Sequence, residues 1–158
     1  MKLGDFVVTD AIIPNLTSTD RNGVIEEMID ALVNAGTVAP ELRDEMIKEV
    51  IKREKKGSTG FGKGVAVPHV KHEKVPKIAA CIGVSREGVD FNALDKEPVY
   101  SVFMIFSPLD RPDEHLQAME NIFAHLQKDT FRRFLRQART VEAVTELIQE
   151  ADSQQFQV

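Results

Sequence analysis

Cysteine is almost absent from this sequence of 158 residues, in which Cys81 stands alone. A single cysteine excludes an internal disulfide and a zinc site built from several cysteines. Long apolar runs are absent too, because none approaches the roughly 20 residues that span a bilayer. The first ten residues also lack the apolar centre and cleavage site of a signal peptide. We therefore expect a cytoplasmic protein with no direct membrane insertion.

An excess of positive charge is also missing, since 20 Lys and Arg residues are outnumbered by 25 Asp and Glu residues, for a formal net charge of -5. Nucleic-acid binding needs a basic surface that displaces counterions from phosphates, so the composition argues against a nucleic-acid partner. The one dense basic run, at 52–56, closes a predicted helix, where cations favour the negative end of the helix dipole. Its simplest interpretation is a solvated helix end.

The rest of the composition is typical of one folded domain, with 42% hydrophobic and 28% charged residues and no low-complexity tract. We expect a single α/β domain over residues 1–152 and a frayed tail at 153–158. Apolar periodicity predicts strands at 6–9, 65–67, 78–84 and 98–106. Helices are predicted through Val24–Val33, from Pro40, from Pro112, and after caps at Asp129 and Thr140.

The helix from Pro112 carries an apolar stripe that we expect to face the core: Leu116, Met119, Ile122, Phe123 and Leu126. His125 is expected on the surface of the same helix, and His72 on a surface loop. Cys81 lies within an apolar strand, so its expected role is that of a small core residue.

The glycine-rich stretch GSTGFGK at 57–63 matches the start of the phosphate-binding P-loop, G-x-x-x-x-G-K. A P-loop follows a strand, precedes a helix and takes Ser or Thr after its lysine. Here a helical pattern ends at Lys56, a strand begins at Val65, and Gly64 follows Lys63. The dinucleotide motif G-x-G-x-x-G fails as well, so we expect no nucleotide cofactor.

The same stretch leads to Val67-Pro68-His69. Proline fixes its own φ and holds the preceding residue extended, so the His69 imidazole is expected to emerge at a strand end from a constrained backbone. Neutral imidazole is nucleophilic near physiological pH and can leave again from a phosphoryl adduct. His69 is therefore a candidate phosphoryl acceptor, although a histidine judged by position alone is more often structural.

Two other residues could support a phosphohistidine. His115 falls in the first turn of the helix from Pro112, where exposed amides and the helix dipole favour an anion and a ring N–H could donate to a phosphoryl oxygen. Arg53 lies three residues after Val50, so it leans toward the buried side of its helix, where a guanidinium could stabilise transferring charge. The alternative is that both are solvated helix-end residues.

A metal site is a further alternative for these histidines. The set His69, His72, Glu73 and His115 fits the pattern H-x-x-H-E only loosely. We expect no metal.

Residues 53–69, REKKGSTGFGKGVAVPH, resemble the signature of the type-2 enzyme IIA (EIIA) domain of the bacterial phosphoenolpyruvate-dependent phosphotransferase system (PTS). This is the fructose/mannitol family, which includes the nitrogen-regulatory IIA proteins. The segments Val89–Asp95 and His115-Leu116 also agree with it, so the resemblance covers nearly the whole chain. It implies a five-stranded mixed β-sheet flanked by helices on both sides.

The resemblance also implies roles for individual residues. His69 would accept a phosphoryl group from a small histidine phosphocarrier protein (HPr-like), His115 would support the phosphohistidine, and Arg53 would stabilise its charge, with no metal or nucleotide involved. Glycine commonly follows the active histidine in this family, whereas Val70 follows it here, and Lys63 fills a variable position of the signature. Both are candidate modulators of the transfer.

The fate of the phosphoryl group separates three hypotheses. The G-S-T-G run and the F-N-A-L-D-x-x-P-V segment look closest to the nitrogen-regulatory branch, which predicts a regulator whose phosphorylation state controls binding to target proteins. No IIB-like cysteine segment follows in this sequence, but a IIA component of sugar uptake that passes phosphate to a IIB domain is the alternative. A phosphate-inert binding module on the same fold is the third.

Overall fold

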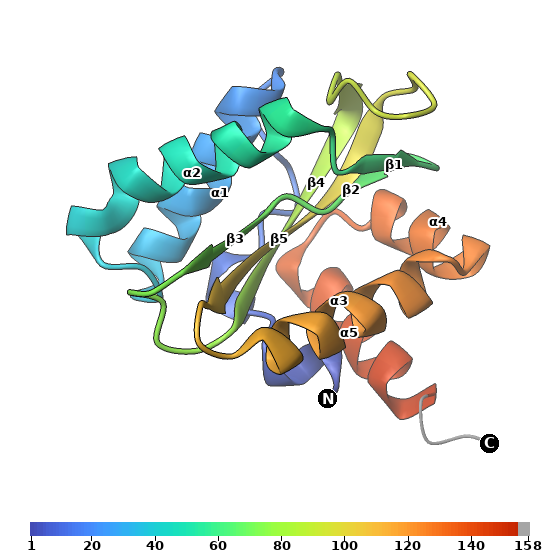
Figure 1. Cartoon of the computed structure of the whole chain (residues 1–158). Helices are drawn as coiled ribbons and strands as arrows, with labels where there is room; N and C mark the ends of the chain where they lie inside the picture. Colours follow the sequence, from blue (N-terminus) through green and yellow to red (C-terminus); the bar gives the residue numbers. More distant parts are fainter. Residues whose placement is uncertain (155–158) are drawn as a thin grey trace.

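A five-stranded mixed β-sheet lies between two layers of helices (Figure 1). The computed structural model describes residues 1–154. Its strands are β1 (Gly60–Gly62), β2 (Val65–Ala66), β3 (His69–His72), β4 (Ala79–Val89) and β5 (Val99–Pro108). Its α-helices are α1 (Arg21–Asn34), α2 (Arg43–Lys56), α3 (Pro112–Leu126), α4 (Asp129–Gln137) and α5 (Val141–Gln154). Three short 3₁₀ helices are η1 (Leu3–Asp5), η2 (Thr9–Ala11) and η3 (Pro40–Leu42). The fold class inferred from the sequence is confirmed.

Strand β5 is the centre of the sheet. It pairs antiparallel with β4 on one side and parallel with both β2 and β3 on the other, and β1 pairs antiparallel with β2 at the edge. Strands β2 and β3 follow one another along β5, and Pro68 lies in the break between them. Its carbonyl accepts a hydrogen bond from the Ile105 N–H at 2.9 Å, so the chain stays in line with the sheet and delivers His69 opposite Ile105.

Both faces of β5 are buried, which explains why its sequence is a continuous apolar run. Val102, Met104 and Phe106 face a core shared with α1 and α2. Phe103 and Ile105 face a second core shared with α3, α4 and α5. The alternation of side chains along a strand therefore divides the hydrophobic interior into two cores, one on each side of the sheet, under the two helical layers seen in Figure 1.

Polar contacts hold the helical layers to the rest of the fold. Arg43 at the start of α2 binds Glu26 and Asp30 of α1 at 2.8 and 2.5 Å. In the other layer, the Asp152 carboxylate in α5 accepts the backbone N–H groups of Leu3 and Gly4 at 2.8 and 2.9 Å. These bonds tie the first turn of the chain to its last described helix.

Several predicted elements differ from those observed. Residues 6–9 form no strand, because two 3₁₀ turns flank a single bridge from Val7 to Ala80. Strand β4 continues to Val89, beyond the predicted end at 84, with Gly88 at φ +87° beside a shift in register. The glycine-rich stretch at 57–63, where no strand is predicted from the sequence, contains the edge strand β1. Asp129 is the first helical residue of α4, and the cap position is Lys128.

Helix α3 buries most of the predicted stripe, because Ile122 and Leu126 are in the core and Met119 and Phe123 pack against it, but not Leu116. Its buried residues are His115, Ala118, Ile122, His125 and Leu126, while Leu116 is 58% exposed. The predictions of an inward Leu116 and a surface His125 were therefore wrong. Both sets of residues have helical spacing, so the packing of α3 against the sheet, rather than the polarity of each residue, decided which side is buried. Cys81 is buried as expected.

The end of the chain was expected to fray from residue 153. Helix α5 continues to Gln154, and residues 155–158 lie outside the described part of the chain. Within residues 1–154, every helix is too short or too polar to cross a membrane.

Candidate active site

His69 is the first residue of β3 and lies between helices α2 and α3. Its Nδ1 is 3.0 Å from the carbonyl oxygen of Val67. Because a carbonyl oxygen can only accept a hydrogen bond, Nδ1 carries the proton of the neutral ring and Nε2 keeps its lone pair. The backbone two residues upstream thus sets the tautomer that leaves Nε2 free as a nucleophile. The sequence suggested a histidine at the end of β2; the structure places it at the start of a separate strand.

His115 lies beside His69, although the two are far apart in sequence. The ring centroids are 5.5 Å apart, with the ring planes at 52°. His115 is buried in the first turn of α3, and its Nδ1 is 2.5 Å from Oγ of Ser107. The structure therefore brings the two candidate histidines together.

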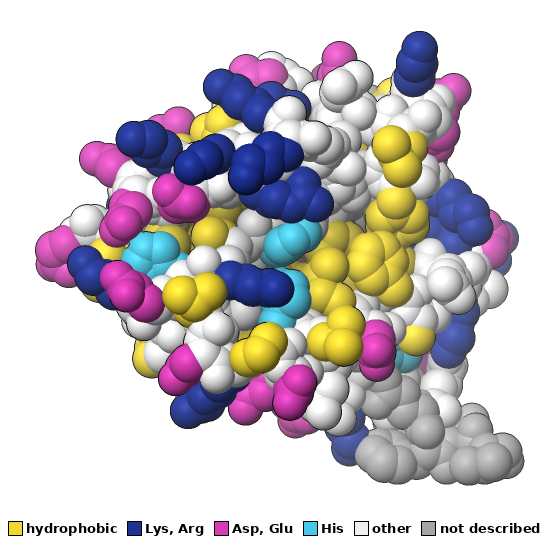
Figure 2. Space-filling view, in the orientation of Figure 1, with side chains coloured by type: hydrophobic (Ala, Val, Ile, Leu, Met, Phe, Trp, Pro, Cys, Tyr) yellow, Lys and Arg dark blue, Asp and Glu magenta, His cyan; other side chains and the backbone are white. Residues whose placement is uncertain are grey.

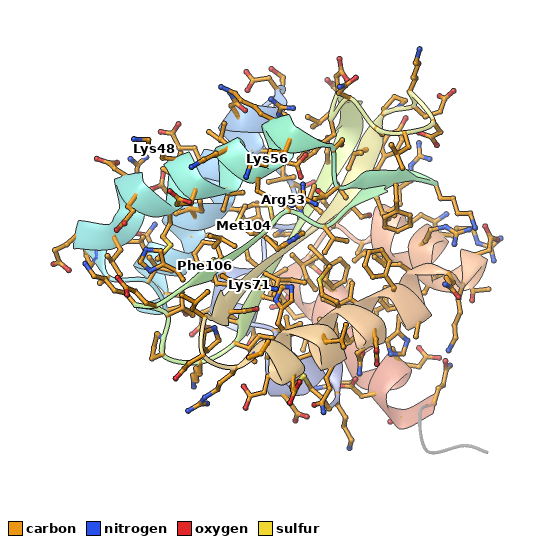
Figure 3. The ribbon with its side chains drawn as sticks, in the orientation of Figure 1. Lys48, Arg53, Lys56, Lys71, Met104 and Phe106 are labelled. Carbon is orange, nitrogen blue, oxygen red and sulfur yellow. The ribbon has the colours of Figure 1, made fainter. Side chains whose placement is uncertain are left out.

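The cleft beside His69 is rich in positive charge. It has a volume of about 330 Å³ and is lined by Glu49, Lys52, Arg53, Lys56, His69, Val70 and Lys71, which are four cations against one carboxylate. Arg53 and Lys56 come from α2, and Lys71 comes from the strand next to it (Figure 3). Histidine side chains reach the surface beside this basic region (Figure 2). An open cleft of this charge favours an anion.

Arg53 is tethered where the helix meets the glycine-rich segment. Its Nη1 donates to the carbonyl oxygen of Gly57 at 2.8 Å, a group at the negative end of the α2 dipole. The same guanidinium carries charge that acts on the His69 ring. Arg53, His69 and His115, the three residues selected from the sequence, thus converge on one region of the protein.

Both histidines are held in the neutral state. Burial lowers the pKa of His69 below 6.5, and the charges of Arg53 and Lys71 lower it further against the opposing effects of the Val67 carbonyl and Glu54. Burial, followed by the charges of Lys71 and His69, lowers the pKa of His115 to about 4. At neutral pH, His69 is therefore a nucleophile with a free lone pair, and His115 is a neutral ring that can donate one hydrogen bond.

Sequence reasoning missed three residues of this region. Glu54 is buried at the end of α2, and its carboxylate accepts hydrogen bonds from the backbone N–H and hydroxyl of Thr59. The i, i+4 row of Met46, Val50 and Glu54 could have revealed this burial. Lys71 follows His69 by two residues, so strand alternation places it on the same face. Ser107 had no local signal, because its partner lies across the sheet–helix junction.

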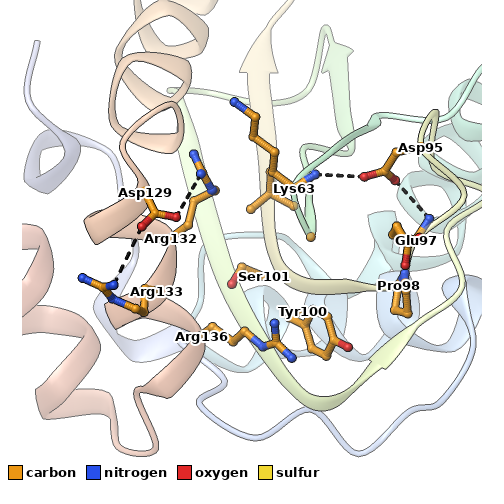
Figure 4. Close-up of a pocket in the computed structure, with 12 residues that line it drawn as sticks. Lys63, Asp95, Glu97, Pro98, Tyr100, Ser101, Asp129, Arg132, Arg133 and Arg136 are labelled. Carbon is orange, nitrogen blue, oxygen red and sulfur yellow. Dashed lines mark hydrogen bonds and ion pairs between the residues drawn. The ribbon is translucent and has the colours of Figure 1, made fainter.

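The other residues noted in the sequence lie elsewhere. Lys63 is in the β1–β2 turn with φ +61°, and its N–H donates to Asp95. It lines a separate cavity of about 460 Å³ together with Tyr100, Arg132, Arg133 and Arg136 (Figure 4). Val70 borders the cleft beside His69 but is itself buried, as part of the core next to α1 and α2. His72 belongs to β3 and contacts Glu45 at 3.3 Å.

Within residues 1–154, no three His, Cys, Asp or Glu side chains gather as metal ligands would.

Comparison with known proteins points to one family. Residues 5–151 match the family described as "Phosphoenolpyruvate-dependent sugar phosphotransferase system, EIIA 2". The chain is 32% identical over 152 residues to the PTS system fructose-specific EIIABC component of Bacillus subtilis, covering 96% of this chain but only 24% of that protein. It is also 32% identical over 135 residues to a nitrogen regulatory protein of Pseudomonas aeruginosa, covering 85% and 86% of the two chains.

A solved structure shows the same fold. The nitrogen regulatory protein IIA-Ntr of Neisseria meningitidis superposes with a TM-score of 0.83 at 25% identity, covering 92% of this chain and 98% of that one. The sheet, the helical layers and the order of elements described above are therefore shared with a IIA protein of known structure.

Proposed function

The chain belongs to the EIIA type 2 family of the phosphoenolpyruvate-dependent sugar phosphotransferase system, and from this premise we propose that it carries a phosphoryl group on Nε2 of His69. The observation that carries the proposal is the contact between Nδ1 of His69 and the carbonyl oxygen of Val67. This Nδ1–H donates to the Val67 carbonyl at 3.0 Å, so Nε2 presents a lone pair beside a cleft lined mainly by cations.

The phosphoryl transfer requires no reagent beyond the donor and acceptor histidines, because one N–P bond forms as another breaks. The Nε2 lone pair of His69 attacks the phosphorus atom of a phosphohistidine on an HPr-like phosphocarrier. A new N–P bond forms, and the N–P bond of the donor breaks with its electron pair returning to the donor imidazole. The phosphorylated His69 ring keeps its Nδ1–H, and the Val67 carbonyl continues to accept from it.

The surrounding residues stabilise the phosphoryl oxygens. Negative charge is spread over these oxygens in a loose transition state, so catalysis depends on positioning and electrostatics. Arg53 and Lys71 supply positive charge beside His69, and His115 offers a ring N–H from the other side. Each therefore acts on the group in transit, while His69 alone forms the covalent bond.

Regulation is the proposed use of the phosphorylated protein. The IIA-Ntr fold match and the Pseudomonas nitrogen regulatory relative, which the chain covers for most of its length, support this role. The alternative is sugar uptake with transfer to a IIB domain, supported by the fructose-specific relative of equal identity. A phosphate-inert binding module would have no use for a bare Nε2 in a cationic cleft.

Phosphorylation in a purified system tests the proposal. The protein is incubated with phosphoenolpyruvate, enzyme I and HPr, and the acid-labile phosphate is measured by intact mass. Wild type should gain one phosphoryl group and His69→Ala none. His72→Ala is the matched control, because His72 lies on the same strand but contacts Glu45. A wild type that gains no phosphate would contradict the proposal. Subsequent transfer to a purified fructose-type IIB domain would favour uptake over regulation.

A further inference from the structure

The environment of Ser107 determines which nitrogen of His115 holds the proton. Ser107 lies in β5, is fully buried, and places Oγ 2.5 Å from Nδ1 of His115. The Ser107 hydroxyl is therefore shielded from water, and Nδ1 of His115 is its one partner among the described residues.

The direction of this hydrogen bond follows because the buried Ser107 hydroxyl proton requires an acceptor. If His115 donated from Nδ1–H, the serine proton would have no acceptor in a buried position, which is unfavourable. If Ser107 donates to Nδ1, the donor and the acceptor are both satisfied. Nδ1 then holds the lone pair, and the proton of the neutral ring must be on Nε2.

The other side of the His115 ring is open. Nε2 has no partner in the described chain and is not among its buried unpartnered atoms, so it reaches solvent. The His69 ring is 5.5 Å away. Burial keeps His115 neutral at physiological pH, so the tautomer, rather than a positive charge, decides whether this nitrogen attracts or repels an anion.

We propose that Ser107 is a positioning residue that locks His115 in the Nε2–H tautomer, so that this ring donates a hydrogen bond to the phosphoryl group on His69. The two histidines then have opposite tautomers, a lone pair on Nε2 of His69 and a proton on Nε2 of His115. The backbone carbonyl of Val67 sets the first and the hydroxyl of Ser107 sets the second. This role rests on the proposed function, whereas the hydrogen-bond direction does not.

Three variants of the full-length chain test this role. Ser107→Ala removes the hydroxyl, whereas Ser107→Thr and Ser107→Val add similar bulk and differ in whether a hydroxyl is present. Ser101→Ala is the control, because Ser101 is a buried serine of the same strand that has no contact with His115. Circular dichroism and thermal unfolding establish that each variant is folded.

The first readout is the tautomer of His115, measured at neutral pH by long-range ¹⁵N–¹H NMR. Wild type, Ser101→Ala and Ser107→Thr should show the Nε2–H form, and Ser107→Ala and Ser107→Val a mixture of both tautomers. A merely structural role for Ser107 would not require this redistribution. A wild type with the proton on Nδ1 would overturn the proposal.

The second readout is the rate of phosphoryl transfer from HPr. Ser107→Ala and Ser107→Val should transfer roughly tenfold more slowly, less than the 10²–10³ lost when a transition-state donor is removed outright. Ser107→Thr should retain most of the wild-type rate. Equal rates in the Thr and Val variants would overturn the role in transfer. If wild type takes no phosphate, the proposed function and this positioning role in transfer both fail, while the NMR result still decides the hydrogen-bond direction.

Discussion

The carboxylate of Glu54 binds both polar donors of Thr59. The Thr59 N–H lies 3.2 Å from each carboxylate oxygen, and the Thr59 hydroxyl also donates to Oε1. Glu54 belongs to the last turn of α2, whereas Thr59 directly precedes β1, so this contact closes the segment between helix and sheet. Glu54 directly follows Arg53, which lines the cationic cleft. The contact between Glu54 and Thr59 therefore also holds the end of α2 that carries Arg53.

Removal of the Glu54 carboxylate should destabilise the fold. Glu54→Ala leaves the partly buried N–H and hydroxyl of Thr59 without this acceptor, which should lower the free energy of unfolding by about 1–3 kcal/mol. Thr59→Val removes only the hydroxyl donor and should cost less. Urea unfolding measures both values. A Glu54→Ala variant within about 0.5 kcal/mol of wild type, the range of ordinary surface substitutions, would contradict this account.

Neutralisation of Arg53 should raise the pKa of His69. The Arg53 charge lowers this pKa, so Arg53→Gln should move the NMR titration of His69 to higher pH and slow its phosphorylation by roughly 10²-fold, the scale of a lost transition-state donor. Lys56→Gln is the control, since Lys56 lines the same cleft but is not among the groups that shift His69. An unchanged titration in Arg53→Gln would refute the electrostatic role.

His115 should make the fold sensitive to acid. Its pKa is about 4 in the folded protein and about 6.5 in an unfolded chain, so the unfolded state binds more protons between these values. Stability therefore rises with pH across this window: it is fully present above about 6.5 and is lost as pH falls toward 4. His115→Gln should flatten this slope, measured by urea unfolding at successive pH values. Parallel curves for the two proteins would show that His115 contributes nothing to it.

Val70 should matter for stability rather than for transfer. Its side chain is 7% exposed and packs into the core next to α1 and α2. Val70→Gly loses this burial and adds backbone entropy, at a cost of about 2–4 kcal/mol. Phosphorylation at a temperature where the variant remains folded should proceed near the wild-type rate. A transfer rate altered more than tenfold would instead make Val70 a modulator, as its position after His69 first suggested.

A substitution at Lys63 should stabilise the fold rather than destabilise it. Lys63 adopts φ +61° in the β1–β2 turn, a conformation that costs most residues about 1 kcal/mol or more but costs glycine little. Lys63→Gly should therefore raise the free energy of unfolding by up to about 1 kcal/mol, whereas Lys63→Ala should not. Both should leave the transfer rate unchanged, because Lys63 lines a different cavity from His69. Slower transfer in both variants would assign its charge a role at the site.

The sequence was sufficient for features that depend on local order. Pro68 interrupts the strand before His69, apolar periodicity marks α1 and α2, and the unbroken apolar run before Ser107 indicates a strand covered on both faces. The signature at 53–69 pointed to His69 and Arg53, which prove to line one cleft. These inferences hold because backbone conformation and side-chain alternation are set mainly by neighbouring residues.

Only the tertiary structure decided what lies beside His69. His125 is buried and Leu116 exposed because the packing of α3, rather than the polarity of each residue, determined which face turned inward. The 5.5 Å approach of His69 and His115, and the 2.5 Å contact of His115 with Ser107, join segments separated along the chain. The protonation states and tautomers depend on burial and on the direction of single hydrogen bonds, and these exist only once β3, β5 and α3 have packed together.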